Sequence, residues 1–363
     1  MDLITRGKRA YRKVRYLQDL ARTERQGLKK SPVPLRKRPA MWRHGFLGES
    51  YALYDLSRND WRLYLPDTAY YLRTPFINYG RFNAILNDKI LFYYAMKSIG
   101  ASTPPVFGFV RRGGVAWIDP PAGVGGRTGV RTLIEQGREL VLKPGSGGGG
   151  GGVSFVREVG GSLTINGEER DMAAVEALLV PGALISERVH QGAYADRINA
   201  EATNTIRIVT MLDPHDDEPF LAWVVHRFAT RRSLPVDNFG QGGLSAAVDL
   251  ETGELGQAAS FPYTGHLDWH SVHPDTGGRI AGASITAWPL IRERILYVAR
   301  RLPQLPLIGW DVVAQDDGLS ILEGNSYPNP RTVQVHQPLL SDPRVREFYR
   351  HHRIVRGRRA GAS

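Results

Sequence analysis

The segment GWDVVAQDDGLSILEGN, residues 309–325, carries the carboxylates Asp311 and Glu323 and the amide Asn325 on either side of a polar centre. Two apolar runs flank residues 316–318, Asp-Asp-Gly, and this pattern predicts a β-hairpin. If these three residues form the loop, with the glycine in the left-handed conformation, Asp311 faces Glu323 directly across the hairpin. Asn325 then lies on the same face of the ribbon.

The other face of this hairpin is expected to hold Val312, Ala314 and Leu322. Like charges placed directly opposite each other destabilise a sheet unless a cation lies between them. Carboxylate and amide oxygens suit a hard cation, and Mg²⁺ is usually held by one or two carboxylates together with the phosphates of a substrate. We therefore interpret the carboxylate pair and the amide as a magnesium site. The alternative is the solvated face of an ordinary hairpin.

The stretch ELVLKPGSGGGGGGVSFV, residues 139–156, places Lys143 and a run of glycines between two strand-like segments. Glycine loses more backbone entropy on folding than any other residue, so the run is either a linker or a loop that a ligand orders. A G-x-G-x-x-G pattern marks a dinucleotide site only where a helix follows, and here a strand-like segment follows. We interpret the run as a flap whose backbone N–H groups close over a polyphosphate. The alternative is a disordered surface hairpin.

A helix is predicted to carry Lys89 in its first turn. Asn87 or Asp88 can cap the start of this helix, and Gly100 can end it. Its apolar residues recur at helical spacing, at Ile90, Leu91, Tyr94, Ala95 and Ile99.

The remaining elements predict an α+β fold in several lobes, because strands occur in small groups with helices between them. The helices are expected at 171–180, capped by Asp171, and at 288–302. The strands before the hairpin are expected at 104–110, 139–143, 153–156, 162–169 with an Asn166-Gly167 turn, 183–190, 204–212 and 219–230.

The chain has 363 residues, of which 42% are hydrophobic and none is cysteine. This composition indicates a globular protein. The absence of cysteine excludes disulfides, thiolate metal sites and a cysteine nucleophile. No apolar run is long enough to span a membrane, and the N-terminal segment lacks the apolar stretch of a signal peptide. We therefore expect a cytoplasmic protein, in which oxygen and nitrogen groups carry any chemistry.

Basic residues are concentrated at the two ends of the chain, so that the formal net charge of +11 arises there. Such ends suit an anionic membrane face, possible at the inner membrane, or an acidic protein partner; the alternative is a solvated helix and a frayed tail. Nucleic acid is not expected, since no aromatic-rich RNA motif or zinc finger accompanies the charge. The segments are interpreted as a basic N-terminal extension, an N-terminal lobe, a lobe with the glycine flap, a lobe with the metal-binding hairpin and a basic tail. Their bounds are 1–43, 44–103, 104–190, 191–342 and 343–363.

The order of these motifs resembles that of the ATP-grasp superfamily. The motifs are a lysine at a helix start, a lysine followed by a glycine flap, an ISERV strand and a D…ExN hairpin. Within it, the chain is similar to the sugar-transfer-associated group, also described as α-L-glutamate-ligase-like, over about residues 46–342. The resemblance implies two antiparallel-sheet-plus-helix lobes that grip ATP, with an additional N-terminal lobe. The ordered set of motifs is much more specific than any one of them.

The resemblance also implies roles for individual residues. Arg207 would reach the γ-phosphate or an acyl phosphate, and Mg²⁺ would be held by Asp311, Glu323 and Asn325. ATP would be held by Lys89 and Lys143 at its α- and β-phosphates, by the flap Gly147, Gly148, Gly149, Gly150, Gly151 and Gly152, by the hinge Ser186, Glu187, Arg188 and Val189, and by Asn238 and Gly243 near the phosphates.

Each role has a simpler alternative. Lys89 can be a helix-surface lysine, Arg207 can pair with an acid across its sheet, and Glu187 can be an exposed strand residue. Gln241 stands where some relatives carry arginine, which puts a phosphate role for that position in doubt. Three histidines lie in a Pro- and Gly-rich segment rather than on a helix, and a zinc site is not expected there; they are His266, His270 and His273.

The function that these features favour is an ATP- and Mg²⁺-dependent carboxylate–amine ligase that forms an amide through an acyl phosphate. The group's name implies small-molecule substrates from cell-surface polysaccharide or peptide tailoring, some of them sugar-linked. Two alternatives are a kinase that phosphorylates a hydroxyl and a polyanion-binding adaptor with an inactive nucleotide site.

Overall fold

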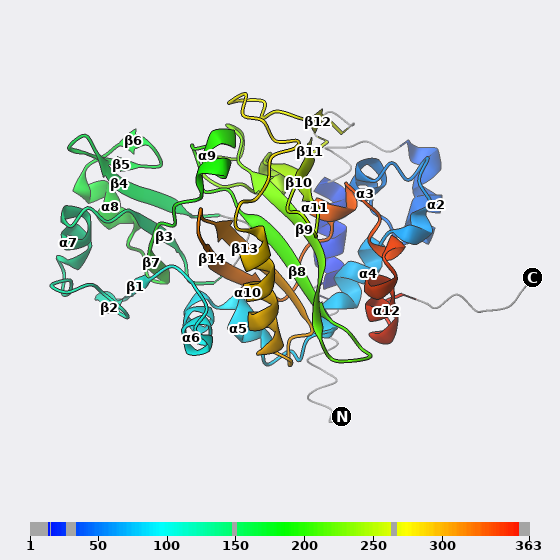
Figure 1. The fold of residues 1–363 in the computed structure, drawn as a ribbon, viewed down its shortest axis with the longest axis horizontal. Helices are drawn as coiled ribbons and strands as arrows, with labels where there is room; N and C mark the ends of the chain where they lie inside the picture. The colour runs from blue at the N-terminus through cyan, green and yellow to red at the C-terminus, as the bar shows by residue number, and fades with distance from the viewer. Residues whose placement is uncertain (1–13, 15, 27–33, 147–150, 263–266, 356–363) are drawn as a thin grey trace, which may run out of the picture.

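The computed structural model describes residues 14, 16–26, 34–146, 151–262 and 267–355. Two antiparallel sheets lie beside each other, each with helices against it (Figure 1). The predicted α+β class is thereby confirmed. The predicted boundary at residue 190 lies between the last strand of one sheet and the first strand of the other.

The first sheet has the strand order β2-β1-β7-β3-β4-β5-β6 over the described residues. Helices α7 (Gly129–Glu135) and α8 (Met172–Leu178) contribute Leu133 and Val175 to its core. The strands are β1 Val106–Arg111, β2 Gly114–Trp117, β3 Leu140–Pro144, β4 Ser154–Val159, β5 Ser162–Ile165, β6 Glu168–Glu169 and β7 Ala183–Glu187. Asn166 and Gly167 have φ values of 53° and 84° between β5 and β6, which confirms the predicted tight turn.

The second sheet has the order β12-β11-β10-β9-β8-β13-β14, again over the described residues. Helix α10 (Trp288–Arg300) packs on one face of it through Trp288, Ile291 and Ile295. The strands are β8 Ile206–Leu212, β9 Pro219–Phe228, β10 Leu244–Val248, β11 Leu255–Ser260, β12 Trp269–His270, β13 Leu307–Ala314 and β14 Leu319–Asn325. Shorter helices lie between strands at α9 Ala193–Ile198 and η4 Phe239–Gln241.

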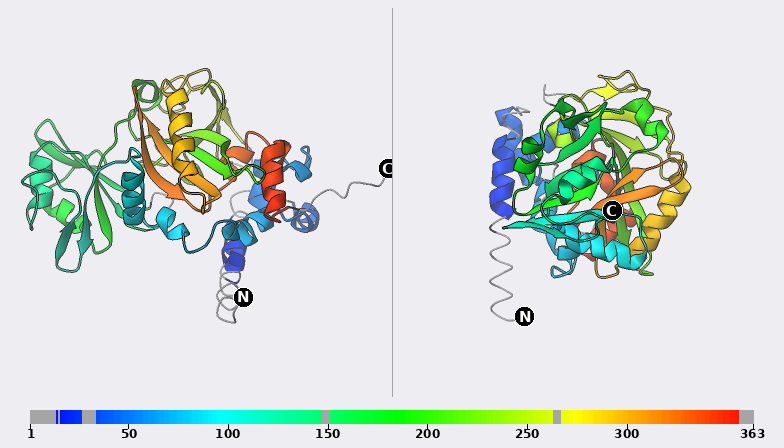
Figure 2. Two further views of the ribbon diagram at one scale, coloured as in Figure 1. Left: turned by 60° about the horizontal axis from the view of Figure 1, so that its bottom comes forward. Right: turned by 90° about the vertical axis from the view of Figure 1, so that its left-hand side faces the viewer.

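Helix α6 (Lys89–Ile99) lies between the two sheets (Figure 2). The carboxylate of Asp88 accepts hydrogen bonds from the backbone N–H groups of Ile90 and Leu91, at 2.9 and 3.0 Å, which confirms the predicted cap. The helix ends at Gly100, whose φ of 74° is left-handed, also as predicted. Lys89 is therefore the first residue of a helix whose start and end are set by Asp88 and Gly100.

The buried face of α6 differs from the predicted apolar stripe. Phe92 and Met96 enter the core of the second sheet, and Tyr93 packs in a separate cluster of the first sheet. Leu91 and Tyr94 belong to the predicted stripe but are 48% and 53% exposed. The other residues of the stripe are partly buried: Ala95 and Ile99 pack against the core of the second sheet, and Ile90 packs against the cluster of Tyr93. Apolar residues surround most of this helix, so their periodicity identified only part of the surface that the two sheets cover.

The predicted N-terminal lobe, residues 44–103, shares its buried side chains with the second sheet. Leu65 and Tyr70 lie in one cluster with strands β8 and β9, and Phe46 lies in another with Ala259. The helices of residues 34–103 before α6 are η1 Leu35–Lys37, α2 Arg38–Arg43, α3 Gly48–Leu53, η2 Trp61–Leu63, α4 Asp67–Leu72, η3 Thr74–Phe76 and α5 Asn83–Asn87.

Part of the basic N-terminal extension is helical and contacts this segment. Residues 16–26 form helix, and Glu24 accepts hydrogen bonds from Trp42 Nε1 and from the backbone N–H of Gly48, both at 2.8 Å. The ring of Tyr16 lies 6.2 Å from that of Tyr327. No helix in the described part of the chain is both long enough and apolar enough to cross a membrane.

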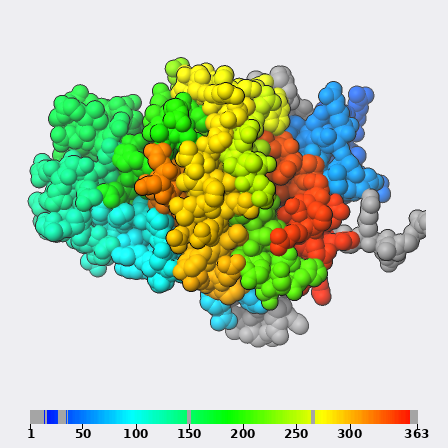
Figure 3. Space-filling view, viewed as in Figure 1, coloured from blue at the N-terminus to red at the C-terminus, as the bar shows by residue number. Residues whose placement is uncertain are grey.

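The C-terminal segment, predicted as a basic tail, begins with a packed helix, α12 (Pro343–His351). Asp342 caps it, as predicted, by accepting hydrogen bonds from the backbone N–H groups of Arg344 and Val345. Its residues Val345, Phe348 and Tyr349 are buried against β8, β9 and α4. Figure 3 shows this segment, in red, between the second sheet and the N-terminal helices. Two short helices precede it, α11 Arg331–Gln334 and η5 Leu339–Ser341.

Replacement of Phe348 by alanine should therefore lower the free energy of unfolding by about 3–5 kcal/mol, because the lost ring leaves a cavity in a shared core. Urea denaturation of this variant and of the unmodified protein measures the difference in the free energy of unfolding. The control is His351→Ala on the exposed side of the same helix, which should change the free energy by no more than about 0.5 kcal/mol. Equal effects of the two substitutions would show that α12 is not packed as described.

Candidate functional site

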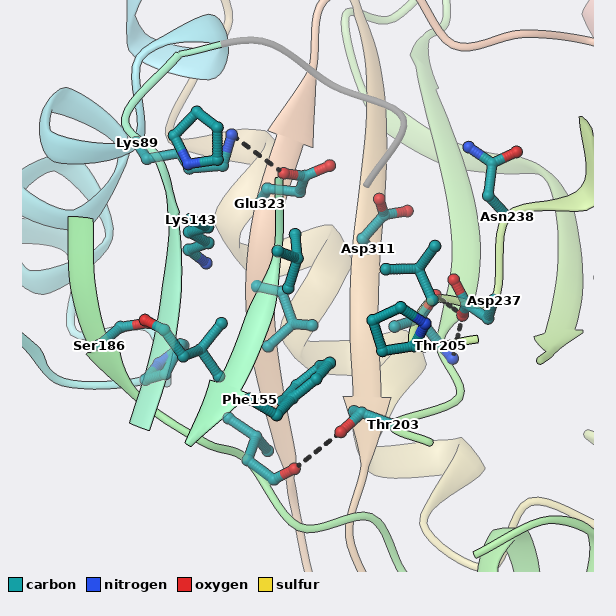
Figure 4. Close-up of a pocket in the computed structure, with 18 of the residues that line it drawn as sticks. Lys89, Lys143, Phe155, Ser186, Thr203, Thr205, Asp237, Asn238, Asp311 and Glu323 are labelled. Carbon is teal, nitrogen blue, oxygen red and sulfur yellow. Dashed lines mark hydrogen bonds and ion pairs between the residues drawn. The ribbon is translucent and has the colours of Figure 1, made fainter. Parts of the chain in front are cut away.

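A pocket of about 240 Å³ lies between the sheets, where β3, β4 and β7 face β8, β13 and β14 (Figure 4). Most of the predicted site residues converge on it from these strands and from α6. The predicted residues that line the pocket are Lys89, Lys143, Gly151, Ser186, Glu187, Val189, Arg207, Asn238, Asp311, Glu323 and Asn325. Gly147, Gly148, Gly149 and Gly150 lie outside the described residues.

The hairpin β13–β14 has the predicted register at its functional end. Asp311 pairs with Glu323, and Asn325 pairs with Gly309. The turn differs from the prediction: the carbonyl of Gly318 accepts a hydrogen bond from the N–H of Gln315, and the φ of Gly318 is not left-handed. The loop between these two residues is therefore one residue shorter than expected.

A β-bulge between Asp311 and Val312 restores the register that the shorter loop would have shifted. The extra residue of the bulge is Leu322 on β14, because Asp311 pairs with Glu323 while Val312 pairs with Ile321. Leu322 was predicted on the opposite face from the carboxylates, and this was wrong. The bulge turns its side chain to the pocket beside Glu323.

Two arginines neutralise Asp311. Arg207 lies directly opposite it on β8 and forms a two-pronged ion pair, with Nε 2.5 Å from Oδ1 and Nη2 3.0 Å from Oδ2. Arg227 on β9 approaches the same Oδ1 at 3.2 Å. Burial alone would raise the pKa of Asp311, but these guanidinium groups hold it well below its ordinary value. Arg207 thus makes the cross-sheet ion pair that was the simpler alternative for it, and it makes that pair inside the pocket.

Glu323 has a weaker cationic partner. Lys89 Nζ lies 3.6 Å from Glu323 Oε2, so the lysine faces the pocket rather than the helix surface. Burial and the charge of Asp311 raise the pKa of Glu323, although Lys89 and Lys143 oppose the rise. The two carboxylates are therefore unequal: Asp311 is stabilised as an anion, and Glu323 is not.

Lys143 lies on β3 across the pocket from this pair (Figure 4). Burial lowers its pKa to about 8, against the opposing effect of Glu323, and the nearby charge of Lys89 adds to the decrease. An ammonium group in this position gains most from an anion that enters the pocket, because such an anion offsets both burial and the second lysine.

One hydrogen-bonded group of pocket residues was missed from the sequence: Arg227, Thr205 and Asp237. The backbone N–H and the hydroxyl of Thr205 donate to Asp237 Oδ2 at 2.7 and 2.5 Å. Arg227 lies 3.5 Å from Asp237 Oδ1 and also bonds to the hydroxyl of Thr205. The available signals were a charged residue within the apolar strand β9 and a carboxylate directly before Asn238.

The predicted hinge has its central backbone amides already engaged. Glu187 N–H donates to the carbonyl of Pro105 at 3.0 Å, and Arg188 N–H donates to that of Glu139 at 2.8 Å. The Glu187 carboxylate accepts from Arg138 Nη1 at 2.6 Å and still lines the pocket. Any backbone contact from an amide of this segment to a ligand therefore falls to Val189, which also lines the pocket.

Three predicted residues are not among those that line the pocket. The side chain of Arg188 pairs with Glu139 at 2.9 Å. Gly243 closes a turn, and a Cβ there would lie 2.6 Å from the carbonyl oxygen of Asp237. Gly152, with φ of 74°, precedes β4.

Two of the three histidines, His270 and His273, lie among the described residues. The described residues contain no group of three or more His, Cys, Asp or Glu side chains that could hold a metal ion. His273 is buried, and its Nε2 contacts the carbonyl of Ala229 at 2.7 Å, while His270 lies in the edge strand β12. His266 lies outside the described residues.

The hairpin fits a divalent cation only in partnership with a bound anion. Asp311 already uses three of its roughly four lone-pair positions on arginines, so it has room for about one further ligand bond. Glu323 has more capacity, and a cation would lower the pKa that its surroundings raise. Two carboxylates with an adjacent amide match the small protein contribution that Mg²⁺ takes beside phosphates.

Comparison with known proteins gave a family match over most of the chain. The model for sugar-transfer associated ATP-grasp proteins matches residues 69–343. A comparison with curated proteins found no match.

Several solved structures are similar at low identity. One is the biotin carboxylase domain of 2-oxoglutarate carboxylase from Hydrogenobacter thermophilus with MgADP, ADP and bicarbonate, at 14% identity, TM-score 0.44, 78% of this chain and 49% of that one. Another is VanG D-Ala:D-Ser ligase from Enterococcus faecalis, at 12% identity and a TM-score of 0.41, over 73% of this chain and 62% of that one. A third is the ADP complex of N5-carboxyaminoimidazole ribonucleotide synthetase, at 11% identity and a TM-score of 0.41, over 70% of this chain and 51% of that one. The chain thus spans 49 to 62% of these structures.

Substitution of Glu323 by glutamine should stabilise the protein at neutral pH. The folded protein raises the pKa of this carboxyl above its unfolded value, so Glu323 holds its proton more tightly when folded. Its contribution to stability is therefore present at low pH and is lost as pH rises from about 4.5 through the raised pKa. We expect the melting temperature of Glu323→Gln, relative to the unmodified protein, to increase between pH 4 and pH 8. A difference that stays constant over this range would contradict the raised pKa.

Proposed function

The chain belongs to the sugar-transfer-associated ATP-grasp family, and we propose that it is an ATP- and Mg²⁺-dependent carboxylate–amine ligase. The observation that carries the proposal is the convergence of four cations on one pocket between two sheets, beside the carboxylate pair of Asp311 and Glu323. The cations are Lys89, Lys143, Arg207 and Arg227, from α6, β3, β8 and β9.

The proposed reaction must bring two anions together, a triphosphate and a substrate carboxylate. Fixed cations in a partly dehydrated pocket offset this repulsion and stabilise charge that develops on the transferring phosphoryl group. Lys143 suits this task because its lowered pKa makes an incoming anion more favourable there. The pairing of Arg207 with Asp311 holds the guanidinium group in place before substrate arrives.

We assign the two ends of the pocket to different parts of ATP. The apolar residues Val141, Phe155 and Leu322 would pack on the base, with Val189 and the carbonyls of the hinge beside its edge. Lys89 and Lys143 would hold the α- and β-phosphates. The glycine run after β3 would close over them, as its sequence predicts.

Glu323 and Asn325, with the remaining capacity of Asp311, would hold Mg²⁺ against the phosphates. When bound, Mg²⁺ would neutralise phosphate charge during transfer. Lys89 would donate to a phosphate from the same ammonium group that contacts Glu323, because this group has three N–H donors.

The proposed chemistry has two steps. A carboxylate oxygen of the acid substrate attacks the γ-phosphorus, the bond to the β-phosphate oxygen breaks, and ADP leaves. The amine then attacks the acyl carbon, the bond from this carbon to the phosphate oxygen breaks, and the nitrogen loses a proton as the amide forms. Arg207 and Arg227, which both line the pocket, would hold the phosphoryl oxygens through both steps.

The family name favours substrates from cell-surface polysaccharide or peptide tailoring, with carboxylate and amine groups on small molecules, some sugar-linked. We place this activity in the cytoplasm, with the basic chain ends available for contact with the inner membrane face or a protein.

The ligase assignment is tested by ADP release across a panel of amino acids and sugar acids, with hydroxylamine as the trapping amine. An acyl phosphate yields a hydroxamate, whereas phosphorylation of a hydroxyl yields none. Glu323→Gln should lower the rate of ADP release by about 100-fold or more, because a ligand of the metal and of the transition state is lost. The matched control is Glu158→Gln on the exposed part of β4, which should keep full activity. ADP release without hydroxamate would replace the ligase assignment by the kinase.

The lowered pKa of Lys143 gives nucleotide binding a pH dependence. The free protein loses this positive charge as pH rises through about 8, whereas a bound phosphate restores the proton. The affinity for MgADP should therefore weaken from pH 7.5 to 9.5. Its Kd should rise by up to about tenfold per pH unit above the pKa of Lys143. Lys143→Arg keeps its charge over this range and should flatten the profile. Parallel profiles in calorimetric titrations would show that Lys143 does not contact the phosphates.

A further inference from the structure

A second cavity, of about 660 Å³, lies at the opposite end of the second sheet from the nucleotide pocket. Its walls come from the segment between α2 and α4 and from the C-terminal helix α12, which lie beside each other in Figure 1. Five arginines line it, and we call it the arginine groove. They are Arg43, Arg62, Arg73, Arg346 and Arg350.

Two of these arginines are oriented by neutral groups. Arg73, at the end of α4, donates from Nη1 to the carbonyl of Ile354 at 2.9 Å. Arg346, on α12, donates from Nε to the carbonyl of Leu340 at 2.6 Å. A carbonyl holds a guanidinium group in place without cancelling its charge, so both remain able to bind an anion.

Carboxylates compensate only part of the charge of the arginine groove. Asp60 pairs with Arg62 at 3.2 Å, and Glu347 lies 3.6 Å from Arg350. The other three arginines have no carboxylate within 4 Å in the described part of the chain. These three come from α2, α4 and α12, so one anion with several oxygens is needed to contact them together.

The rest of the wall is planar or apolar. The rings of Trp61 and His44 stack with their centroids 4.0 Å apart, and Arg62 lies 4.8 Å from the Trp61 ring. Leu72 and Ile354 supply aliphatic surface on the other side. The volume falls within the range of small-molecule sites, which combine an apolar lining with a few oriented polar groups.

We propose that the arginine groove is a second ligand site, which binds the phosphate or diphosphate group of an organic phosphate whose organic part packs on Trp61. A carboxylate offers two oxygens to one guanidinium group, whereas a diphosphate offers oxygens to guanidinium groups from several elements at once. This chemistry is shared by soluble organic phosphates and by phosphorylated lipids at a membrane surface. The site is separate from the nucleotide pocket and its binding does not depend on catalysis.

Calorimetric titration of the full chain with inorganic pyrophosphate tests the site. We expect saturable binding whose Kd rises about tenfold in Arg73→Gln and in Arg346→Gln, since each loses a hydrogen bond to a charged group. Arg43→Gln, at an exposed position, should weaken binding in the same direction. Circular dichroism checks that each variant is folded.

Two controls locate the binding. Arg58→Gln removes an exposed arginine of the same segment outside the arginine groove, and it should leave the Kd unchanged. Lys143→Met alters the nucleotide pocket, where pyrophosphate can also bind, so it should change only that phase of the titration and leave the Kd of the phase that Arg73→Gln weakens. Loss of pyrophosphate binding in Lys143→Met alone would assign the binding to the nucleotide pocket and overturn the proposal, as would an equal loss in Arg58→Gln.

Sedimentation with vesicles distinguishes the two sources of phosphate. Vesicles of equal parts phosphatidic acid and phosphatidylcholine are compared with vesicles of phosphatidylcholine alone. Co-sedimentation that requires phosphatidic acid, and that Arg73→Gln and Arg346→Gln reduce while Arg58→Gln does not, supports a lipid phosphate. Pyrophosphate binding without co-sedimentation supports a soluble ligand. The proposal would be overturned if the protein showed no pyrophosphate binding and no co-sedimentation that depends on these arginines.

Discussion

Two carboxylates held opposite each other on one hairpin are the constraint on which the pocket depends. The register of β13 and β14 places Asp311 beside Glu323, and like charges in this arrangement destabilise a sheet unless cations compensate them. The structure supplies that compensation from other strands and from α6. Arg207 and Arg227 neutralise Asp311, and Lys89 partly neutralises Glu323. Our argument from sequence that a metal must separate the carboxylates was therefore too narrow, because side chains provide the first cations.

This compensation is uneven, and the unevenness gives the site its chemical character. Asp311 spends most of its capacity on two arginines and remains an anion, while Glu323 keeps a raised pKa and more open coordination positions. Lys143 has the complementary property, a cation that burial makes less stable. A pocket with a destabilised anion and a destabilised cation is poised to accept a cation and an anion together. An Mg²⁺-bound polyphosphate has both.

Helix α6 joins this charge arrangement to the packing of the molecule. Phe92 and Met96 bury on the second sheet and Tyr93 on the first, so the helix is fixed against both. Lys89, its first residue, therefore reaches a pocket whose two walls come from different sheets. At the far end, α12 closes the other face of the second sheet and, with α4, forms the arginine groove. The basic chain ends are in this way partly folded into the molecule.

The sequence by itself determined the features that depend on near neighbours. Asp88 and Gly100 bound a helix, Asn166-Gly167 makes a turn, and alternation along residues 309–325 identifies the face that carries the carboxylates. Cap and turn preferences act within a few residues, so they can be recognised locally. Most predicted site residues could be named because their motifs, taken in order, resemble the ATP-grasp superfamily, but the fold brings them into one pocket.

Tertiary structure alone decided which distant groups face each other. Arg227 and Asp237 join the site only because β9 and the segment after it lie beside β8. The buried face of α6 depends on two sheets that the helix sequence does not describe. The bulge at Leu322 offsets a turn that is one residue shorter than its sequence predicts, and turn preferences alone did not reveal this combination. Burial and electrostatic compensation arise between segments remote in the chain, and only their folding together sets the charges of this pocket.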